Sequence, residues 1–200
     1  MYKIQDKRGP FSSHTIEVYN NFFSSEIHKK IWELMLEPKW SICPGRSFWH
    51  INFLEKEDYF SKYLFEIICK KLRGRREDKA SFKCGRVYAN GQTAGQSGRP
   101  HVDDSQYTFL YFPNPEWQPN WGGNLIFLNR EGPEGYPNFT PEQWKWQYEY
   151  NKKDEISKIV TYRPNRAVLF PGNAVHYAEA PHNHFNGLRT SVAFKLLNPE

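Results

Sequence analysis

The sequence of 200 residues is poor in cysteine and has no long apolar run. Its three cysteines, Cys43, Cys69 and Cys84, lie far apart and form no Cys-x-x-Cys pair, which argues against a disulfide framework or a zinc knuckle. The mean hydropathy is too low for a membrane span. Residues 1–10 carry charges and no apolar stretch, so we expect no secretory signal and a cytoplasmic location.

Basic residues are in excess and give the chain a net charge of +5. Such a charge could suit nucleic acid, and the densest basic run consists of Lys70, Lys71, Arg73, Arg75 and Arg76. This run closes a predicted helix, where cations complement the helix dipole. Nucleic-acid binding is therefore the less favoured interpretation.

The first 80 residues predict two helices that support a larger fold. A short strand is expected over 15–19, and Ser24 then caps a helix that ends before Pro38. A second helix is expected over 57–73, with Gly74 as its stop. The apolar residues expected to face the core are Ile27, Ile31, Leu34 and Met35 in the first helix, and Phe60, Leu64, Ile67, Ile68 and Leu72 in the second.

After Ala80 the pattern changes to short apolar runs broken by Gly, Pro and Asn, which is typical of an antiparallel sandwich or barrel. The predicted strands are 82–88, 100–102, 107–112, 123–128, 159–162, 167–170, 175–180 and 189–196. This number of strands predicts a mainly β protein, a cupin-like double-stranded β-helix or jelly roll supported by two helices. We expect a single domain over 1–200, with helical support in 1–80 and the jelly-roll core in 81–200.

An insertion over 129–158 interrupts the predicted jelly roll. It is polar and aromatic, and a capping-box helix start is expected at Thr140. It is long enough to act as a lid over a site, and its aromatic residues could equally pack to keep the insertion folded.

A His-x-Asp pair, His101 and Asp103, is the central motif. Residues two apart on a strand project to the same face, so both side chains can point at one metal ion. A third ligand must come from a distant strand, and a jelly roll can bring His176 there. Two imidazoles and one carboxylate form the ligand set of non-haem Fe(II) oxygenases. His182 and His184 compete for the third position, but their Pro-, Asn- and Gly-rich turn predicts solvated or substrate-facing histidines.

Several motifs over 82–196 resemble those of the 2-oxoglutarate-dependent Fe(II) oxygenases, within their prolyl-hydroxylase-like branch. The stretch Tyr-Thr-Phe-Leu-Tyr-Phe at 107–112, followed by Asn114, Trp117 and Gly-Gly-Asn-Leu at 122–125, is similar to the strand and Gly-Gly-x-Leu turn of that branch. The segment 163–170 before His176 is similar to the strand that precedes the distal histidine.

The resemblance implies a cosubstrate site. Arg189-Thr190-Ser191 looks like the Arg-x-Ser motif in which a guanidinium binds the far carboxylate of 2-oxoglutarate through two hydrogen bonds. Ser191 lies on the same strand face and can add a hydroxyl donor. Tyr88 matches a position where family members use a tyrosine hydroxyl on the cosubstrate. Some members place a tyrosine where Phe112 stands, and the loop before Arg189 is longer here.

The resemblance also implies the reaction. Fe(II), 2-oxoglutarate and O2 are the expected cofactors, with ascorbate as a candidate auxiliary reductant, and a prolyl or other peptidyl residue is the expected substrate. Leu110, Phe112 and Ala193 are expected to line the pocket. Arg99, Trp121 and Trp144 are candidate substrate contacts. Two alternatives stay open: an oxygenase acting on a free amino acid, another small molecule or a nucleic-acid base, and a non-catalytic metal-binding sensor or isomerase on the same fold.

Overall fold

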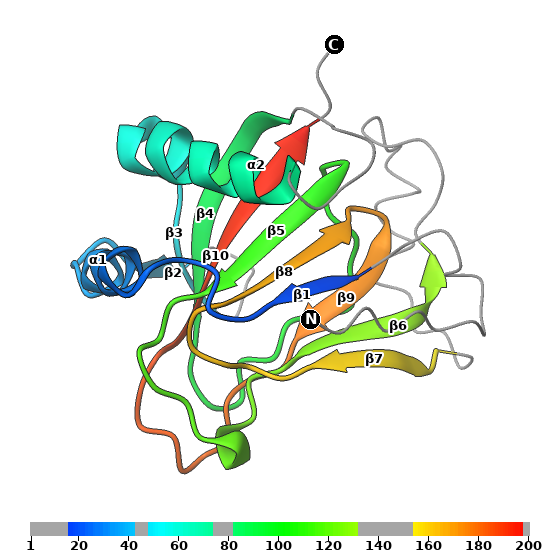
Figure 1. Ribbon diagram of the computed structural model, residues 1–200. Coiled ribbons are helices and arrows are strands. Elements are labelled where there is room, and N and C mark those ends of the chain that lie inside the picture. Colours follow the sequence, from blue (N-terminus) through cyan, green and yellow to red (C-terminus); the bar gives the residue numbers. More distant parts are fainter. Residues whose placement is uncertain (1–15, 43–47, 74–81, 132–153, 198–200) are drawn as a thin grey trace.

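The computed structural model describes residues 16–42, 48–73, 82–131 and 154–197 (Figure 1). Ten strands and two α-helices occur within these residues. The helices are α1 (Ser25–Met35) and α2 (Phe65–Arg73). The strands are β1 (Glu17–Tyr19), β2 (Ser41–Ile42), β3 (Trp49–Ile51), β4 (Lys83–Gln92), β5 (Tyr107–Phe112), β6 (Leu125–Glu131), β7 (Ile156–Val160), β8 (Arg166–Pro171), β9 (Ala174–Ala178) and β10 (Arg189–Leu197).

Two antiparallel sheets make up the β structure. The large sheet has the order β1-β8-β5-β10-β4-β3-β2, and the small sheet has the order β7-β6-β9. An isolated antiparallel bridge between His101 and His176 adds the segment around His101 beside β9. Strands that are distant in the chain are thus neighbours in each sheet, as the predicted jelly roll requires. The fold prediction is confirmed.

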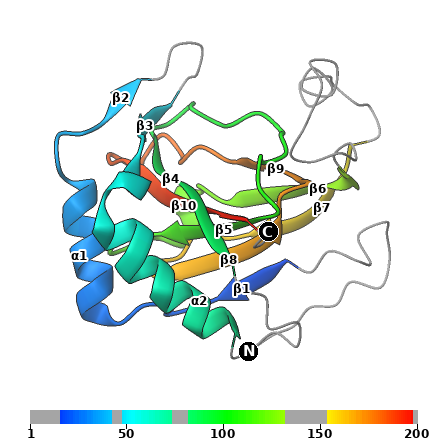
Figure 2. The same cartoon turned by 90° about the horizontal axis from the view of Figure 1, so that it is seen from above.

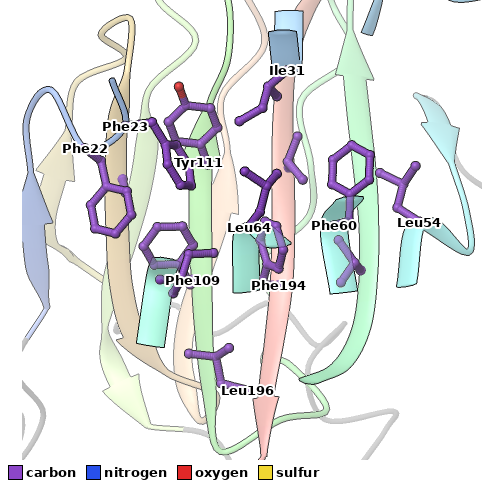
Figure 3. Close-up of a cluster of buried hydrophobic side chains, with 14 of the residues drawn as sticks. Phe22, Phe23, Ile31, Leu54, Phe60, Leu64, Phe109, Tyr111, Phe194 and Leu196 are labelled. Atoms are coloured by element: carbon purple, nitrogen blue, oxygen red, sulfur yellow. The ribbon is translucent and has the colours of Figure 1, made fainter. Parts of the chain in front are cut away.

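Both helices cover the outer face of the large sheet, away from the small sheet (Figures 1 and 2). The N-terminal cap of α1 forms as predicted, because the Ser24 hydroxyl accepts a hydrogen bond from the backbone N–H of Ile27. The helices bury their apolar stripes against residues from the outer face of the sheet, among them Phe109 on β5 and Phe194 on β10 (Figure 3). The opposite, inner face of the large sheet carries the polar residues described below, together with a second apolar cluster.

A second apolar cluster lies between the two sheets. It includes Leu110 and Phe112 of β5, Ala193 of β10, and residues of the small sheet such as Leu125 and Phe127. Successive residues of β10 therefore face opposite sides, so that Arg189, Ser191, Ala193 and Lys195 share the inner face while Val192, Phe194 and Leu196 join the outer core.

Local predictions differ from the structure at several points. Strands β6 and β7 extend to Glu131 and from Ile156, so they include both ends of the insertion predicted over 129–158. Strand β4 continues to Gln92, beyond the predicted end at Tyr88, because Asn90 and Gly91 pair with β3 and β10. The helix expected over 57–73 begins with a π-helical turn, Tyr59–Leu64, before α2. Strands β2 and β3 were not predicted, since two- and three-residue strands have too little periodicity to detect. The strand expected over 100–102 is reduced to the single bridge at His101.

Other predictions concern residues 1–15, 74–81 and 132–153. The helix start at Thr140, the stop at Gly74 and the candidate substrate contact Trp144 lie outside the described residues. Within the described residues, no helix has the length and apolar character needed to cross a membrane.

Candidate metal centre

Three side chains predicted as metal ligands meet between the sheets. The Nε2 atom of His101 lies 3.7 Å from Asp103 Oδ1, and Nε2 of His176 lies 3.7 Å from Asp103 Oδ2. One ligand atom from each residue lies within 4.8 Å of the other two. Among the described residues this is the one group of three or more His, Cys, Asp or Glu side chains close enough for a shared ion.

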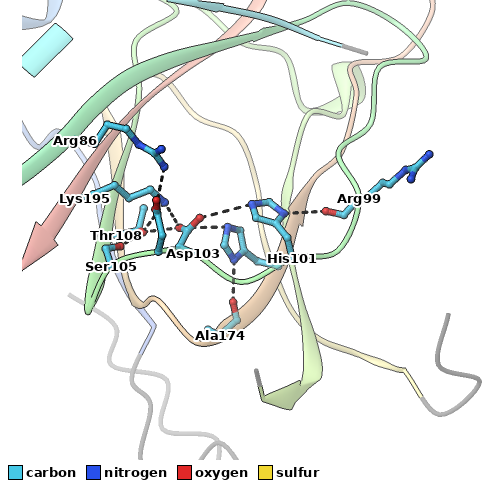
Figure 4. Close-up of polar contacts among 10 residues, drawn as sticks. Arg86, Arg99, His101, Asp103, Ser105, Thr108, Ala174 and Lys195 are labelled. Carbon is cyan, nitrogen blue, oxygen red and sulfur yellow. Dashed lines mark hydrogen bonds and ion pairs between the residues drawn. The ribbon is translucent and has the colours of Figure 1, made fainter. Parts of the chain in front are cut away.

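Backbone contacts fix both imidazoles. His101 and His176 exchange two backbone hydrogen bonds, of 3.0 and 2.9 Å, which set their rings side by side with centroids 4.4 Å apart. Nδ1 of His101 lies 2.8 Å from the carbonyl oxygen of Arg99, and Nδ1 of His176 lies 2.9 Å from that of Ala174 (Figure 4). When each Nδ1–H donates to its carbonyl, both Nε2 atoms keep a lone pair that faces Asp103.

A tight contact places Asp103. Its backbone N–H donates to the carbonyl of Gly172, and Gly172 N–H donates to that of Gln106, at 2.8 and 2.9 Å. A Cβ atom on Gly172 would lie 1.6 Å from the carbonyl oxygen of Ser105. Only glycine therefore allows the chain after Asp103 to approach the turn between β8 and β9 this closely.

The charges of the three ligands suit a cation. Burial lowers the pKa of His176 to about 3, so its ring is neutral near neutral pH. Burial alone would raise the pKa of Asp103, but Lys195 and then the two imidazoles outweigh it and hold this pKa well below its ordinary value. The site thus presents one carboxylate and a neutral buried imidazole.

Lys195, which we did not predict to be part of this site, contacts Asp103 directly. We call the part of the barrel interior that holds His101, Asp103 and His176 the metal end. The Nζ of Lys195 lies 2.5 Å from Asp103 Oδ2 and donates to Thr108 Oγ1 at 3.1 Å. The ring centroid of Tyr88 lies 5.5 Å from the same Nζ. Although burial lowers the pKa of Lys195, Asp103 and Tyr88 raise it above its ordinary value overall, so the ammonium is charged.

Arg189 is wholly buried at the other end of the inner face of β10. Its Nε donates to the carbonyl of Gly123 at 3.0 Å, and its Nη1 donates to Gln92 Oε1 at 2.9 Å and to Ser191 Oγ at 3.4 Å. Its Nη2 is buried without a hydrogen-bond partner in the described part of the chain. Burial lowers the pKa of Arg189 to about 10, which leaves the guanidinium charged near neutral pH.

Aromatic rings complete the wall beside Arg189. Its Cζ atom lies 5.5 Å from the ring centroid of Phe112 and 5.2 Å from that of Tyr162, and these two rings stack on each other. The Tyr162 hydroxyl lies 2.6 Å from Asn114 Oδ1. Phe112 thus contacts Arg189 as an apolar wall, while Leu110 and Ala193 lie in the same cluster between the sheets.

The remaining predicted contacts lie elsewhere. The exposed Arg99 side chain points away from the three ligands (Figure 4). Trp121 packs on Trp117 and Phe185, in loops at the Arg189 end of the barrel rather than at the metal end. His182 is exposed, and its Nδ1 lies 2.8 Å from the Asn120 carbonyl oxygen in the same loops.

The segment 179–184 and the loop that carries Gly95 and Ser97 line an open cavity of about 510 Å³. Its lining includes Ser97, Glu179, His182 and His184. Neither histidine belongs to the cluster of three side chains, whereas His176 does.

Four residues around the two ends were missed in the sequence: Gln92, Thr108, Gly123 and Lys195. The predicted strand over 82–88 ends before Gln92, and the site predictions do not include Lys195. The alternation of β10 carries the signal that could have found Lys195, since it lies on the same face as Arg189 and Ser191.

The sequence matches no protein-family model and no curated protein. Solved structures, in contrast, match nearly the whole chain. A prolyl-4-hydroxylase from Pseudomonas putida aligns with a TM-score of 0.59 and 12% identity, over 95% of this chain and 96% of that chain. HygX from Streptomyces hygroscopicus, with nickel and 2-oxoglutarate bound, aligns with a TM-score of 0.64 and 11% identity, over 93% and 84%. A viral collagen prolyl hydroxylase from Paramecium Bursaria Chlorella virus-1, as a 2-oxoglutarate complex, aligns with a TM-score of 0.55 and 14% identity, over 90% of this chain and 94% of that chain.

The chain has the fold of 2-oxoglutarate/Fe(II) oxygenases. At these identities the likeness is one of fold, and the chemistry of this oxygenase-like chain rests on its own residues.

Proposed function

We propose that this protein is an Fe(II)- and 2-oxoglutarate-dependent oxygenase that hydroxylates an unactivated C–H bond, with residues 1–200 acting as a single domain. The observation that carries the proposal is the pairing of a two-His, one-carboxylate group with a buried guanidinium on the same barrel interior. A sensor or isomerase on this fold would need the first feature but not the second.

His101, Asp103 and His176 would bind the metal. Two Nε2 lone pairs and a carboxylate oxygen converge on one point, and nitrogen and oxygen donors of this kind suit ferrous iron. Because one side of the three-residue group carries all the ligands, the opposite positions are left for other molecules. When bound, Fe(II) would supply a site for 2-oxoglutarate and O2, and so couple decarboxylation of the cosubstrate to succinate with oxidation of the substrate.

Arg189 would bind the far carboxylate of 2-oxoglutarate. Its buried Nη2 has no acceptor in the described part of the chain, and an unpaired buried N–H of a charged group is costly. A carboxylate would accept from Nη2 and would also balance a charge whose hydrogen-bond acceptors, Gly123, Gln92 and Ser191, are all neutral. Ser191 and Tyr88, on the inner faces of β10 and β4, are the further groups that we propose for orienting the cosubstrate.

The apolar cluster of Leu110, Phe112 and Ala193 would keep water away from the cosubstrate. The substrate that fits the resemblance best is a prolyl or other peptidyl residue, supported by the two prolyl hydroxylases among the similar structures. HygX has also been solved with hygromycin B bound, which supports a small-molecule substrate as the second candidate.

The test is turnover of 2-oxoglutarate to succinate by the Fe(II)-loaded protein in air, with proline-containing peptides and small polar molecules offered separately. We expect one class to accelerate succinate formation and to gain one oxygen atom by mass spectrometry. A His176→Ala variant should form no succinate above background. Turnover that survives in this variant would contradict the proposed site.

A further inference from the structure

Lys195 makes an unusual contact for a residue next to a metal-binding carboxylate. Only 2% of its surface is exposed, and its Nζ lies 2.5 Å from Asp103 Oδ2 (Figure 4). The Thr108 hydroxyl donates to the same oxygen, also at 2.5 Å. Lys195 and Asp103 thus form an ion pair that is complete within the protein, before any metal is added.

The two oxygens of Asp103 have different surroundings. Oδ2 receives both Lys195 and Thr108, whereas no hydrogen bond engages Oδ1 within the part of the chain described. Oδ1 lies 3.7 Å from Nε2 of His101. This arrangement leaves Oδ1 free to bind a metal as a single oxygen, while Oδ2 stays on the ammonium and the hydroxyl.

Two cations would therefore share one carboxylate once a metal binds. Like charges a few ångströms apart repel, and burial away from water strengthens this repulsion. Lys195 thus weakens the attraction between Asp103 and the metal. In return, the negative charge of Asp103 is already balanced, so the metal presents more of its own charge to an incoming anion.

We propose that Lys195 is the built-in counter-ion of Asp103: it holds the carboxylate in place for single-oxygen binding and trades metal affinity for affinity toward the anionic 2-oxo acid. The second half of this statement rests on the proposed function, while the first half concerns the metal site alone. Lys195 acts through Asp103 and is therefore a positioning residue.

The test compares Lys195→Met with wild-type protein in two titrations. Mn²⁺ alone is titrated calorimetrically, and 2-oxoglutarate is then titrated into the Mn²⁺-saturated protein. We expect the variant to bind Mn²⁺ more tightly and 2-oxoglutarate more weakly, each by on the order of tenfold, because the metal replaces the lost ammonium. A residue that merely supports the fold would weaken both when replaced.

Three further variants serve as controls. Lys195→Gln keeps a donor toward Asp103 and Thr108 without the charge, so it should reproduce both shifts even if the methionine variant fails to fold. Lys195→Arg keeps the charge and should restore both affinities toward the wild-type values. Thr108→Val removes the other hydrogen bond to Oδ2 without a charge change, and should not tighten Mn²⁺ binding.

Several outcomes would overturn the inference. Weaker Mn²⁺ binding in both neutral variants would make Lys195 a purely structural residue, and unchanged Mn²⁺ affinity would mean that its charge is not felt at the metal. If wild-type protein binds Mn²⁺ but no 2-oxoglutarate, the proposed function fails, while the Mn²⁺ titrations still decide whether Lys195 is the counter-ion.

Discussion

Two buried cations share the inner face of β10, and their surroundings differ in one respect. Lys195 has an anion, Asp103, within 2.5 Å. Arg189 has only neutral acceptors, and its Nη2 has none among the described residues. A charge that is paired inside the protein stabilises the local structure, whereas a charge left without an anion is a place for a ligand. The difference separates the part of the barrel that would hold the proposed metal from the part that would bind the cosubstrate.

The variant with the largest expected effect removes Asp103, the anion that pairs with Lys195. Asp103→Ala leaves the Lys195 ammonium buried and uncompensated, so the free energy of unfolding of the metal-free protein should fall by about 3–5 kcal/mol. Denaturant unfolding measures this change. Adding Lys195→Met to Asp103→Ala should recover part of the loss; a double variant whose losses simply add would contradict the pairing.

The metal end can also be disturbed without changing any ligand. Gly172→Ala places a Cβ atom 1.6 Å from the backbone oxygen of Ser105, so the chain beside Asp103 must move. We expect a loss of about 3 kcal/mol or more in stability, together with weaker Mn²⁺ binding. The matched control is Gly98→Ala, where the new Cβ would lie 3.4 Å from the nearest backbone atom and should be tolerated.

At the unpaired cation the expected pattern is the reverse. Arg189→Met keeps most of the side-chain volume and removes a buried charge that no carboxylate contacts, while Gln92 and Gly123 lose a donor, so metal-free stability should fall by only about 1–2 kcal/mol. Affinity of the Mn²⁺-loaded protein for 2-oxoglutarate should fall by about 2–3 kcal/mol, as for a lost charge-assisted hydrogen-bonded pair. Isothermal titration measures both metal and cosubstrate affinities. Full 2-oxoglutarate affinity in this variant would remove Arg189 from the cosubstrate site.

The last effect concerns pH at the metal end. The pKa of His176 is lowered from 6.5 to about 3 by burial, so between these values the unfolded chain binds a proton that the folded metal-free protein does not. This contribution to stability is complete above about pH 6.5 and decreases as the pH falls toward 3, by about 1.4 kcal/mol per unit. Chemical unfolding at several pH values, with a chelator present, should show this slope in wild-type protein and a smaller one in His176→Gln. Equal slopes would contradict the burial of a neutral ring.

The sequence was sufficient to predict the fold and the clustering of His101, Asp103 and His176. The alternation expected of a strand predicted that His101 and Asp103 share a face; the structure brings them together on a segment with a single bridge at His101. The order of apolar runs predicted a jelly roll, and this fold brings His176 beside them. Arg189 and Ser191 were expected to share a face, and in the structure Nη1 of Arg189 lies 3.4 Å from Oγ of Ser191.

The contacts of these residues could not be predicted, because they depend on register between distant strands. The pairing of Arg189 with Gln92 requires that β4 extend beyond its predicted end. The ion pair between Lys195 and Asp103 requires the approach of two segments 92 positions apart, which only the folded barrel provides. The alternation of β10 puts Lys195 on the face of Arg189 and Ser191, but lysine is mostly exposed in proteins, so its residue type argued against burial.

The most direct test of the central claim is an anaerobic titration of the metal-free protein with Fe(II) and then with 2-oxoglutarate, followed by visible absorption. The account predicts a charge-transfer band of a chelated 2-oxo acid that needs both additions and that weakens in Arg189→Met at the same 2-oxoglutarate concentration. Absence of any band in folded, Fe(II)-loaded protein would contradict the oxygenase assignment and favour a metal-binding sensor or isomerase.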